Sequence, residues 1–156
     1  MKEISLIGST GSIGTQVCAV VRRYPDKFKI KSMVANASAE AFLRQLEEFK
    51  PAYAVLVNEE EGKKIADKIP DGVQFAYGKK AALDAVCYGD TAFVAATGFA
   101  GLEYSLKALE EKKDIARANK ETLVCGGALV MHRMQGAGIR CTVICPKNWG
   151  FTIVCL

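Results

Sequence analysis

The sequence predicts a doubly wound α/β fold, in which a mostly parallel sheet carries helices on both of its faces. Short apolar runs of the kind found in buried strands alternate with helical patterns along most of the chain. The chain has 156 residues, the size of one domain, and half of them are apolar, which is enough for a substantial core. The first apolar run leads straight into a glycine-rich loop and then a helix.

That loop is residues 8–14, Gly-Ser-Thr-Gly-Ser-Ile-Gly, and it precedes a helix predicted over 15–23. Gly8 permits a tight turn out of the strand, Gly11 permits close approach of a pyrophosphate, and Gly14 permits the helix to pack against the strand. Free amides and the helix dipole favour an anion there. The spacing differs from the usual Gly-x-Gly-x-x-Gly fingerprint, so a glycine-rich turn without a ligand is the alternative.

The first half of the chain then repeats strand and helix. An apolar strand is predicted over 28–35, and a helix over 39–49 carries its apolar residues on one face. Pro51 ends that helix, and the near-continuous apolar run 53–57 suits a strand buried on both faces. The helix predicted over 59–68 places acidic residues first and lysines later, as the helix dipole favours.

The second half repeats the pattern, with strands predicted over 73–76, 91–96, 114–118 and 139–144 and helices over 79–87, 102–112 and 119–134. Three loops leave strands and open helices, at 8–14, 97–101 and 119–122. Ligands of doubly wound sheets lie over the carboxyl ends of the strands, where the strand order reverses. We therefore expect the three loops to converge on one dinucleotide-binding cleft of Rossmann type.

The end of the second strand bears on the choice of dinucleotide. A sheet that selects NAD usually carries an Asp or Glu there, to bind the ribose 2′-hydroxyl. This chain has Asn36-Ala37-Ser38 and no acid, which favours NADP. Asn36 and Ser38 are equally well explained as a turn residue and a helix N-cap.

In the third loop, Asn119 suits a helix N-cap, whereas Lys120 opposes the helix dipole and Glu121 offsets part of that cost. A cation placed there indicates a ligand.

Composition excludes other classes. No apolar stretch is long enough for a membrane span, and no secretory signal stands at the N-terminus, so a cytoplasmic protein is expected. The net charge of +4 is spread without a basic block, which argues against nucleic acid and suits a small phosphorylated molecule. The six cysteines form no C-x-x-C pair and His132 is the sole histidine, so reduced cysteines near the core are expected in place of a zinc site.

The loop 8–14, together with Ala118-Asn119-Lys120-Glu121-Thr122-Leu123-Val124, resembles the 1-deoxy-D-xylulose 5-phosphate reductoisomerases over residues 1 to about 140. The resemblance implies an NADPH-dependent oxidoreductase with Mg²⁺ or Mn²⁺. Its reaction, a rearrangement followed by hydride transfer, yields 2-C-methyl-D-erythritol 4-phosphate in the non-mevalonate route to isoprenoids.

The resemblance also implies residue roles. The cofactor phosphates would be held by Thr10, Gly11, Ser12 and Ile13. Asn36, Ala37 and Ser38 occupy the place where the family contacts the adenosine end, although a basic residue common there is missing. Asn119 and Glu121 would touch the cofactor, and Lys120 would contact the phosphorylated sugar substrate.

The sequence departs from the family near its end. The family's Pro-Val-Asp-Ser-Glu-His segment, which supplies metal ligands, is replaced by Cys145-Pro146-Lys147-Asn148-Trp149. Residues 1–144 are therefore expected to form the NADP-binding domain and 145–156 a divergent tail without catalytic residues or metal ligands. Arg117 is a second departure, a charge in a predicted buried strand.

The expected function is thus NADPH binding by part of a reductoisomerase, without turnover by this chain alone. The alternatives are a stand-alone nucleotide-binding module without enzymatic activity, as a monomer or homodimer, and a decayed copy that neither binds nor folds well.

Overall fold

The computed structural model of the chain describes residues 1–96, 100–117, 141–147 and 150–155. Its strands are β1 (Lys2–Ile7), β2 (Phe28–Ala35), β3 (Tyr53–Leu56), β4 (Gln74–Tyr77), β5 (Thr91–Val94), β6 (Asp114–Arg117), β7 (Cys141–Lys147) and β8 (Gly150–Cys155). Its helices are α1 (Ser12–Arg23), α2 (Ala39–Phe49), α3 (Glu59–Ile65), α4 (Lys79–Asp84) and α5 (Ala100–Glu110), with 3₁₀ turns η1 (Ala66–Lys68) and η2 (Ala85–Tyr88).

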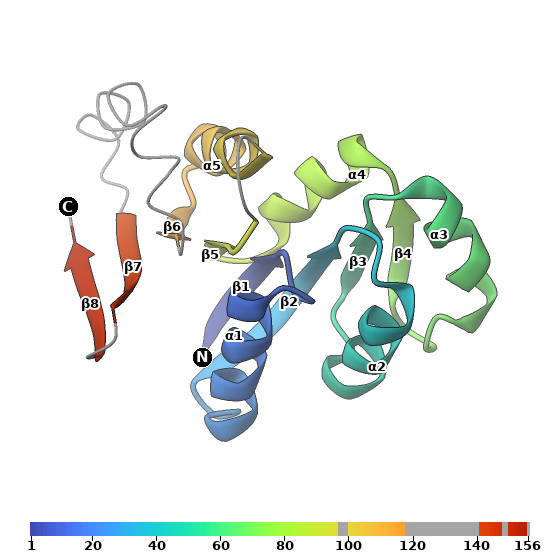
Figure 1. The fold of residues 1–156 in the computed structure, drawn as a ribbon, viewed down its shortest axis with the longest axis horizontal. Coiled ribbons are helices and arrows are strands. Elements are labelled where there is room, and N and C mark those ends of the chain that lie inside the picture. The colour runs from blue at the N-terminus through green and yellow to red at the C-terminus, as the bar shows by residue number, and fades with distance from the viewer. Residues whose placement is uncertain (97–99, 118–140, 148–149, 156) are drawn as a thin grey trace.

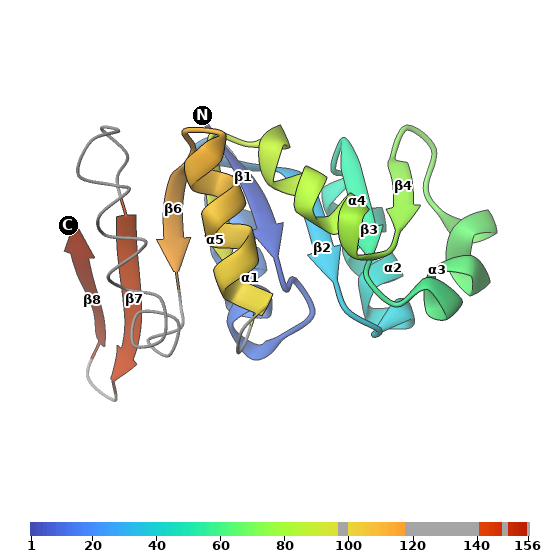
Figure 2. The same cartoon turned by 90° about the horizontal axis from the view of Figure 1, so that it is seen from above.

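The strands form one eight-stranded sheet in the order β4-β3-β2-β1-β5-β6-β7-β8. Every neighbouring pair from β4 to β7 is parallel, and β8 runs antiparallel to β7. From β1 the chain moves outward to β2, β3 and β4 (Figure 2). It then returns to the other side of β1 to form β5. The strand order therefore reverses between β1 and β5.

Helices cover both faces of the sheet (Figure 1), with α1 and α2 on one side and α4 and α5 on the other. Each face has its own hydrophobic cluster. Leu6 of β1 belongs to the cluster with Val17 and Phe42 from α1 and α2. Ile7, the next residue, belongs to the cluster with α4, η2 and α5. The alternation of side chains along β1 feeds both layers, so the predicted doubly wound fold is confirmed.

Two buried serines fix η2 against the sheet. Ser32 Oγ of β2 donates to the Ala85 carbonyl oxygen at 2.6 Å. Ser5 Oγ of β1 donates to the Val86 carbonyl oxygen at 3.2 Å and accepts from the Gly89 amide at 2.8 Å. Both serines are fully buried. These hydroxyls satisfy backbone groups where a helix ends inside the core, so both serines have a structural explanation.

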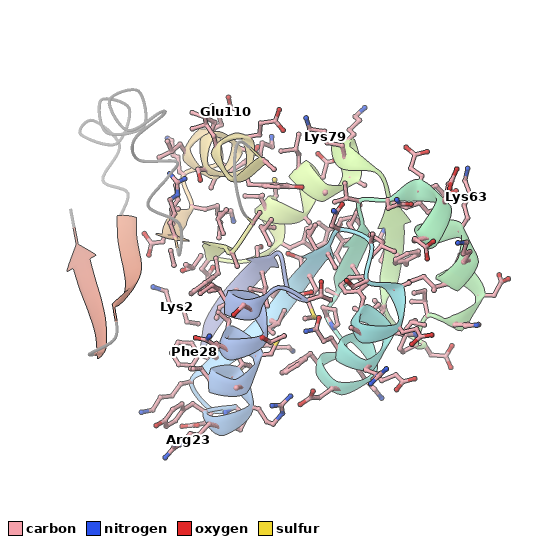
Figure 3. All side chains as sticks on the ribbon, in the orientation of Figure 1. Lys2, Arg23, Phe28, Lys63, Lys79 and Glu110 are labelled. Atoms are coloured by element: carbon pink, nitrogen blue, oxygen red, sulfur yellow. The ribbon has the colours of Figure 1, made fainter. Side chains whose placement is uncertain are left out.

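Charged side chains lie on the outer surfaces of the helices, where Figure 3 labels Lys63, Lys79 and Glu110. Lys79 of α4 pairs with Glu103 of α5 at 2.8 Å and joins the two helices of one layer across their solvent side. None of the described helices combines the length and the apolar character that a membrane span requires.

Most predicted boundaries agree with the structure to within a few residues. The strand 28–35 and the helix 39–49 coincide with β2 and α2. Three differences are larger. α1 begins at Ser12, three residues before the predicted start, so Ser12 and Ile13 belong to its first turn. η2 continues α4 as a 3₁₀ turn, and β8 was not predicted at all.

The end of the chain joins the sheet. β7 extends to Lys147, beyond the expected domain boundary at 144, and β8 pairs with it over its whole length. The boundary itself stays a prediction. Cys18 is a buried free thiol and Cys87 a half-buried one. The helix predicted over 119–134, with His132, lies outside the described residues.

Candidate functional site

A cleft of about 320 Å³ opens where the strand order reverses, over the carboxyl ends of β1, β2 and β5. The register aligns these ends, because Ile7 of β1 lies opposite both Val34 of β2 and Val94 of β5. The cleft is lined by Ile7, Gly8, Thr10, Gly11, Val34, Ala35, Asn36, Val57, Ala95, Ala96, Ala100 and Tyr104. The glycine loop, the end of β2 and the start of α5 therefore meet around one space, as expected for a doubly wound sheet.

The glycine loop is held by backbone hydrogen bonds to its neighbours. The amides of Gly8 and Ser9 both donate to the Val34 carbonyl oxygen, at 2.8 and 2.9 Å. The Ala95 amide donates to the Ile7 carbonyl oxygen at 2.8 Å. Gly8 has a φ of 88°, a conformation that side chains disfavour, so the turn out of β1 requires a glycine there. The loop is thus fixed before any ligand arrives.

The other two glycines differ in what the protein demands of them. A Cβ on Gly14 would lie 2.1 Å from the Gly8 carbonyl oxygen, so the fold excludes any side chain at that position. A Cβ on Gly11 would make only an ordinary contact of 3.5 Å with the same oxygen. Gly11 also has an extended backbone that any residue adopts. The fold therefore does not explain a glycine at position 11.

The N-terminus of α1 is suited to an anion. Gly11 is its N-cap and has no side chain to accept from the first amides, and no acidic residue stands in the first turn. The helix α3 shows the opposite arrangement, with Asn58 accepting from the Glu61 amide and three glutamates in its first turn. Because the first amides of a helix have no partner within the helix, those of α1 are available to a phosphate.

The side chain of Gln45, in α2, forms a hydrogen bond to the glycine loop. Gln45 Nε2 donates to the backbone carbonyl oxygen of Ser9 at 2.9 Å. Ser9, the second residue of the loop, is fully buried. Gln45 therefore links the helix after β2 to the loop after β1. The sequence interpretation missed this contact, since nothing in a helical pattern marks which polar residue reaches a neighbouring loop.

At the end of β2, Asn36 lines the cleft, whereas Ala37 and Ser38 are exposed beside it. Ser38 is the N-cap of α2, as one of the two interpretations held, but its hydroxyl makes no capping hydrogen bond. The Asn36 carbonyl oxygen accepts from the Asn58 amide at 2.9 Å, which ties this loop to the one after β3. No acid is among the described residues that line the cleft.

The structure thus brings Thr10, Gly11 and Asn36 together at one cleft. Ser12 and Ile13 lie beside it in the first turn of α1. The candidates Asn119, Lys120 and Glu121 and most of the loop 97–101 lie outside the described residues, so their roles stay predictions. Arg117 is 1% exposed at the end of β6, which confirms the predicted charge in a buried strand.

Tyr104 is a cleft residue that the sequence interpretation missed. Its helical spacing with Gly101, Ser105 and Ala108 marks Tyr104 as part of the buried face of α5, but does not show that it reaches the cleft. Burial raises the pKa of the phenol, and the Glu103 carboxylate adds to the rise. The hydroxyl therefore keeps its proton at neutral pH and can donate a hydrogen bond.

Among the described residues, no group of three or more His, Cys, Asp or Glu side chains is placed to hold a metal ion. The described cleft offers backbone amides for an anion, apolar walls, and the polar side chains of Thr10, Asn36 and Tyr104.

Comparison with known proteins agrees with this geometry. The sequence model of the 1-deoxy-D-xylulose 5-phosphate reductoisomerases matches residues 4–127. The reductoisomerase of Shouchella clausii is 40% identical over 133 residues, which are 84% of this chain and 35% of that protein. The reductoisomerase of Moorella thermoacetica is 41% identical over 137 residues, 86% of this chain and 36% of that protein. The chain thus spans about a third of the length of these relatives.

Solved structures give the same result. The reductoisomerase of Zymomonas mobilis in complex with NADPH superimposes with a TM-score of 0.83 at 25% identity, covering 92% of this chain and 38% of that one. A DOX-P reductoisomerase in complex with magnesium gives a TM-score of 0.80 at 26% identity, covering 93% and 37%. Sequence, fold and cleft agree, and the chain belongs to the 1-deoxy-D-xylulose 5-phosphate reductoisomerase family.

Proposed function

We propose that this chain binds NADPH and forms the cofactor-binding part of a reductoisomerase that converts 1-deoxy-D-xylulose 5-phosphate to 2-C-methyl-D-erythritol 4-phosphate. The observation that carries the proposal is the pairing of Gly11, a glycine that the fold does not need, with the uncapped N-terminus of α1. The Zymomonas mobilis neighbour, which holds NADPH, supports the same ligand. The activity is proposed for the whole protein, with cofactor binding and no turnover assigned to this stretch.

In this proposal the diphosphate lies on the loop between Thr10 and Ile13, with the Thr10 hydroxyl at the cleft. The amides of Ser12 and Ile13 are available to it, whereas the Gly11 amide donates to the Gly8 carbonyl oxygen at 3.2 Å. The adenosine end extends toward Asn36, Ala37 and Ser38, where the absence of an acid from the described lining favours a 2′-phosphate over a free 2′-hydroxyl. Asn119 and Glu121 are proposed to contact the cofactor and Lys120 the phosphorylated substrate. Mg²⁺ or Mn²⁺ is proposed for the whole protein, with no ligands assigned to this chain.

A substitution at Gly11 tests the proposal, because stability and binding should change in opposite directions. In Gly11→Asp, the new carboxylate can cap α1 and favour its dipole, which raises stability by about 0.5–1 kcal/mol. The same charge repels a diphosphate and occupies its seat. Thermal melting with and without NADPH measures both effects, since a ligand at a hundredfold excess over Kd stabilises by about 2.7 kcal/mol.

We expect a larger shift with NADPH than with NADH for the natural chain, and no shift for Gly11→Asp despite a melting temperature at least as high. Ala66→Asp is the control, because it adds the same charge at an exposed position with an ordinary helical backbone, and Ala66 does not line the cleft. A folded natural chain without a shift for either nucleotide contradicts the proposal, as does an unchanged shift in Gly11→Asp.

A further inference from the structure

Tyr104 lies one turn into α5, between the core and the cleft. Its side chain is 6% exposed and belongs to the hydrophobic cluster of Ile7, Val34 and Val94, which come from the carboxyl ends of β1, β2 and β5. Tyr104 also lines the cleft. Its ring is therefore held by packing against the three strands, and the small accessible part of the side chain faces open space.

The hydroxyl of Tyr104 has no hydrogen-bond partner within the described part of the chain. It is not sealed in the core either: the buried hydroxyls without a partner are those of Ser9 and Thr91. A tyrosine hydroxyl usually finds a partner when its ring is buried. The free hydroxyl at a cleft is thus a donor held in place with its hydrogen-bonding capacity unused.

The position of this hydroxyl along the cleft determines which part of a bound ligand it can contact. The polar side chains among the described lining residues are those of Thr10, Asn36 and Tyr104. Thr10 and Asn36 follow β1 and β2, whereas the described lining on the side of β5 is otherwise made of Ala95, Ala96 and Ala100. Tyr104 is therefore the polar side chain on the β5 side of the described cleft.

We propose that the Tyr104 hydroxyl donates a hydrogen bond to the ribose–nicotinamide half of the bound dinucleotide and sets the affinity for that half. The inference rests on the proposed function, which seats the diphosphate over the glycine loop and the adenosine half toward Asn36. The second half must then extend over β5, toward Ala95 and Tyr104. Because packing already fixes the ring, binding loses little side-chain entropy on forming this bond.

The test compares Tyr104→Phe with Tyr53→Phe in the 156-residue chain. Each variant loses one hydroxyl from a tyrosine of the same cluster with similar burial, 6% and 7% exposed, but Tyr53 does not line the cleft. Two probes are titrated: NADPH, and adenosine 2′,5′-bisphosphate, which lacks the ribose–nicotinamide half. Melting without ligand is measured beside each titration, to separate binding from folding.

For Tyr104→Phe we expect the Kd for NADPH to rise about three- to tenfold, the loss of one net hydrogen bond, with the Kd for the bisphosphate unchanged. Tyr53→Phe should leave both constants unchanged. An unchanged Kd for NADPH in Tyr104→Phe overturns the inference and leaves the proposed function intact. An equal loss for both probes also overturns it, since the hydroxyl would then act on the whole cleft. A natural chain that binds neither probe overturns the proposed function as well.

Discussion

Gly14 passes so close to Gly8 that a Cβ atom on Gly14 would lie 2.1 Å from the Gly8 carbonyl oxygen and 2.6 Å from that of Ser9. Both oxygens belong to a backbone fixed between β1 and α1, so no side-chain movement relieves the overlap. Gly14→Ala should lower the free energy of unfolding by about 1–3 kcal/mol, as overpacking does in cores. Urea denaturation followed by circular dichroism measures the change.

Gly11→Ala is the matched control, since its Cβ would meet the same oxygen at 3.5 Å. We expect its free energy of unfolding to stay within about 1 kcal/mol of the natural value, because a poorer N-cap is offset by a less flexible unfolded chain. Equal losses for the two variants would show that the described approach of α1 to Gly8 is wrong.

The hydrogen bond from Ser32 to the Ala85 carbonyl oxygen gives a second prediction. Both residues are fully buried, and the bond joins β2 to η2 at 2.6 Å. Ser32→Ala should lower the free energy of unfolding by about 1–2 kcal/mol, because a buried carbonyl loses a donor that water cannot replace. Chemical denaturation at neutral pH is the measurement.

Ser105→Ala serves as the comparison for Ser32→Ala. Ser105 is also fully buried, but its hydroxyl donates to the Gly101 carbonyl oxygen one helical turn earlier. That oxygen already faces the Ser105 amide of α5, so losing the hydroxyl should cost less than about 0.5 kcal/mol. A larger loss for Ser105→Ala than for Ser32→Ala would contradict the anchoring role given to Ser32.

Lys50 ends α2 in the left-handed region, with a φ of 41°, and its amide donates to the Leu46 carbonyl oxygen at 3.0 Å. A glycine adopts this conformation without the steric cost that lysine bears. Lys50→Gly should therefore raise stability by about 0.5–1 kcal/mol. Glu47→Gly in the same helix should instead lower it by about 1 kcal/mol, because glycine is a poor helix former. A thermal melt of both variants distinguishes these opposite signs.

The ion pair of Arg22 and Glu48 joins α1 to α2, with Arg22 Nη2 at 2.8 Å from Glu48 Oε2. The hydrogen bond from Arg22 holds the pKa of the Glu48 carboxyl below its usual value. A carboxyl with a lowered pKa in the folded state contributes stability above its unfolded pKa and loses it as the pH falls. Glu48→Gln should thus flatten, slightly, the fall in stability between about pH 5 and pH 3.

The effect at Glu48 is expected to be small because solvent screens both exposed side chains. Glu47→Gln, which removes an exposed carboxyl that forms no ion pair among the described residues, is the control and should leave the slope nearly unchanged. A slope for Glu48→Gln as steep as that of the natural chain would mean that the pair adds nothing to folding.

Much of the fold follows from the sequence because hydrophobic periodicity agrees with the residues that end helices and strands. The strand at 28–35 and the helix at 39–49 were predicted to the residue, since Pro51 and the polar turn at 36–38 bound them clearly. The start of α1 was placed late because side-chain caps guide such predictions, and the cap here is Gly11. β8 was missed because an apolar run at the end of a chain does not reveal its partner strand.

The site was predictable in part for a related reason. The spacing of the loop 8–14 pointed to Thr10 and Gly11, and the end of β2 pointed to Asn36, because parallel strands bring their carboxyl ends together. Tyr104 and Gln45 were not predicted. Tyr104 reaches the cleft from α5 and Gln45 reaches the glycine loop from α2, and both contacts depend on how the helices pack and not on a local sequence pattern. The sequence predicted different reasons for Gly11 and Gly14, a pyrophosphate and helix packing. The 2.1 Å approach of a Cβ on Gly14 agrees with the packing role, and the ligand role of Gly11 stays a prediction.

The side chains of Leu6 and Ile7, adjacent in β1, lie on opposite faces of the sheet and belong to separate hydrophobic clusters. Replacements that shrink these two side chains should add nearly independently, because the partners of one do not touch the other. In a library of variants, codon 6 should thus co-vary with codons for α1 and α2, and codon 7 with those for η2 and α5. Two adjacent codons would thus be constrained by different parts of the protein, one by each face of the sheet.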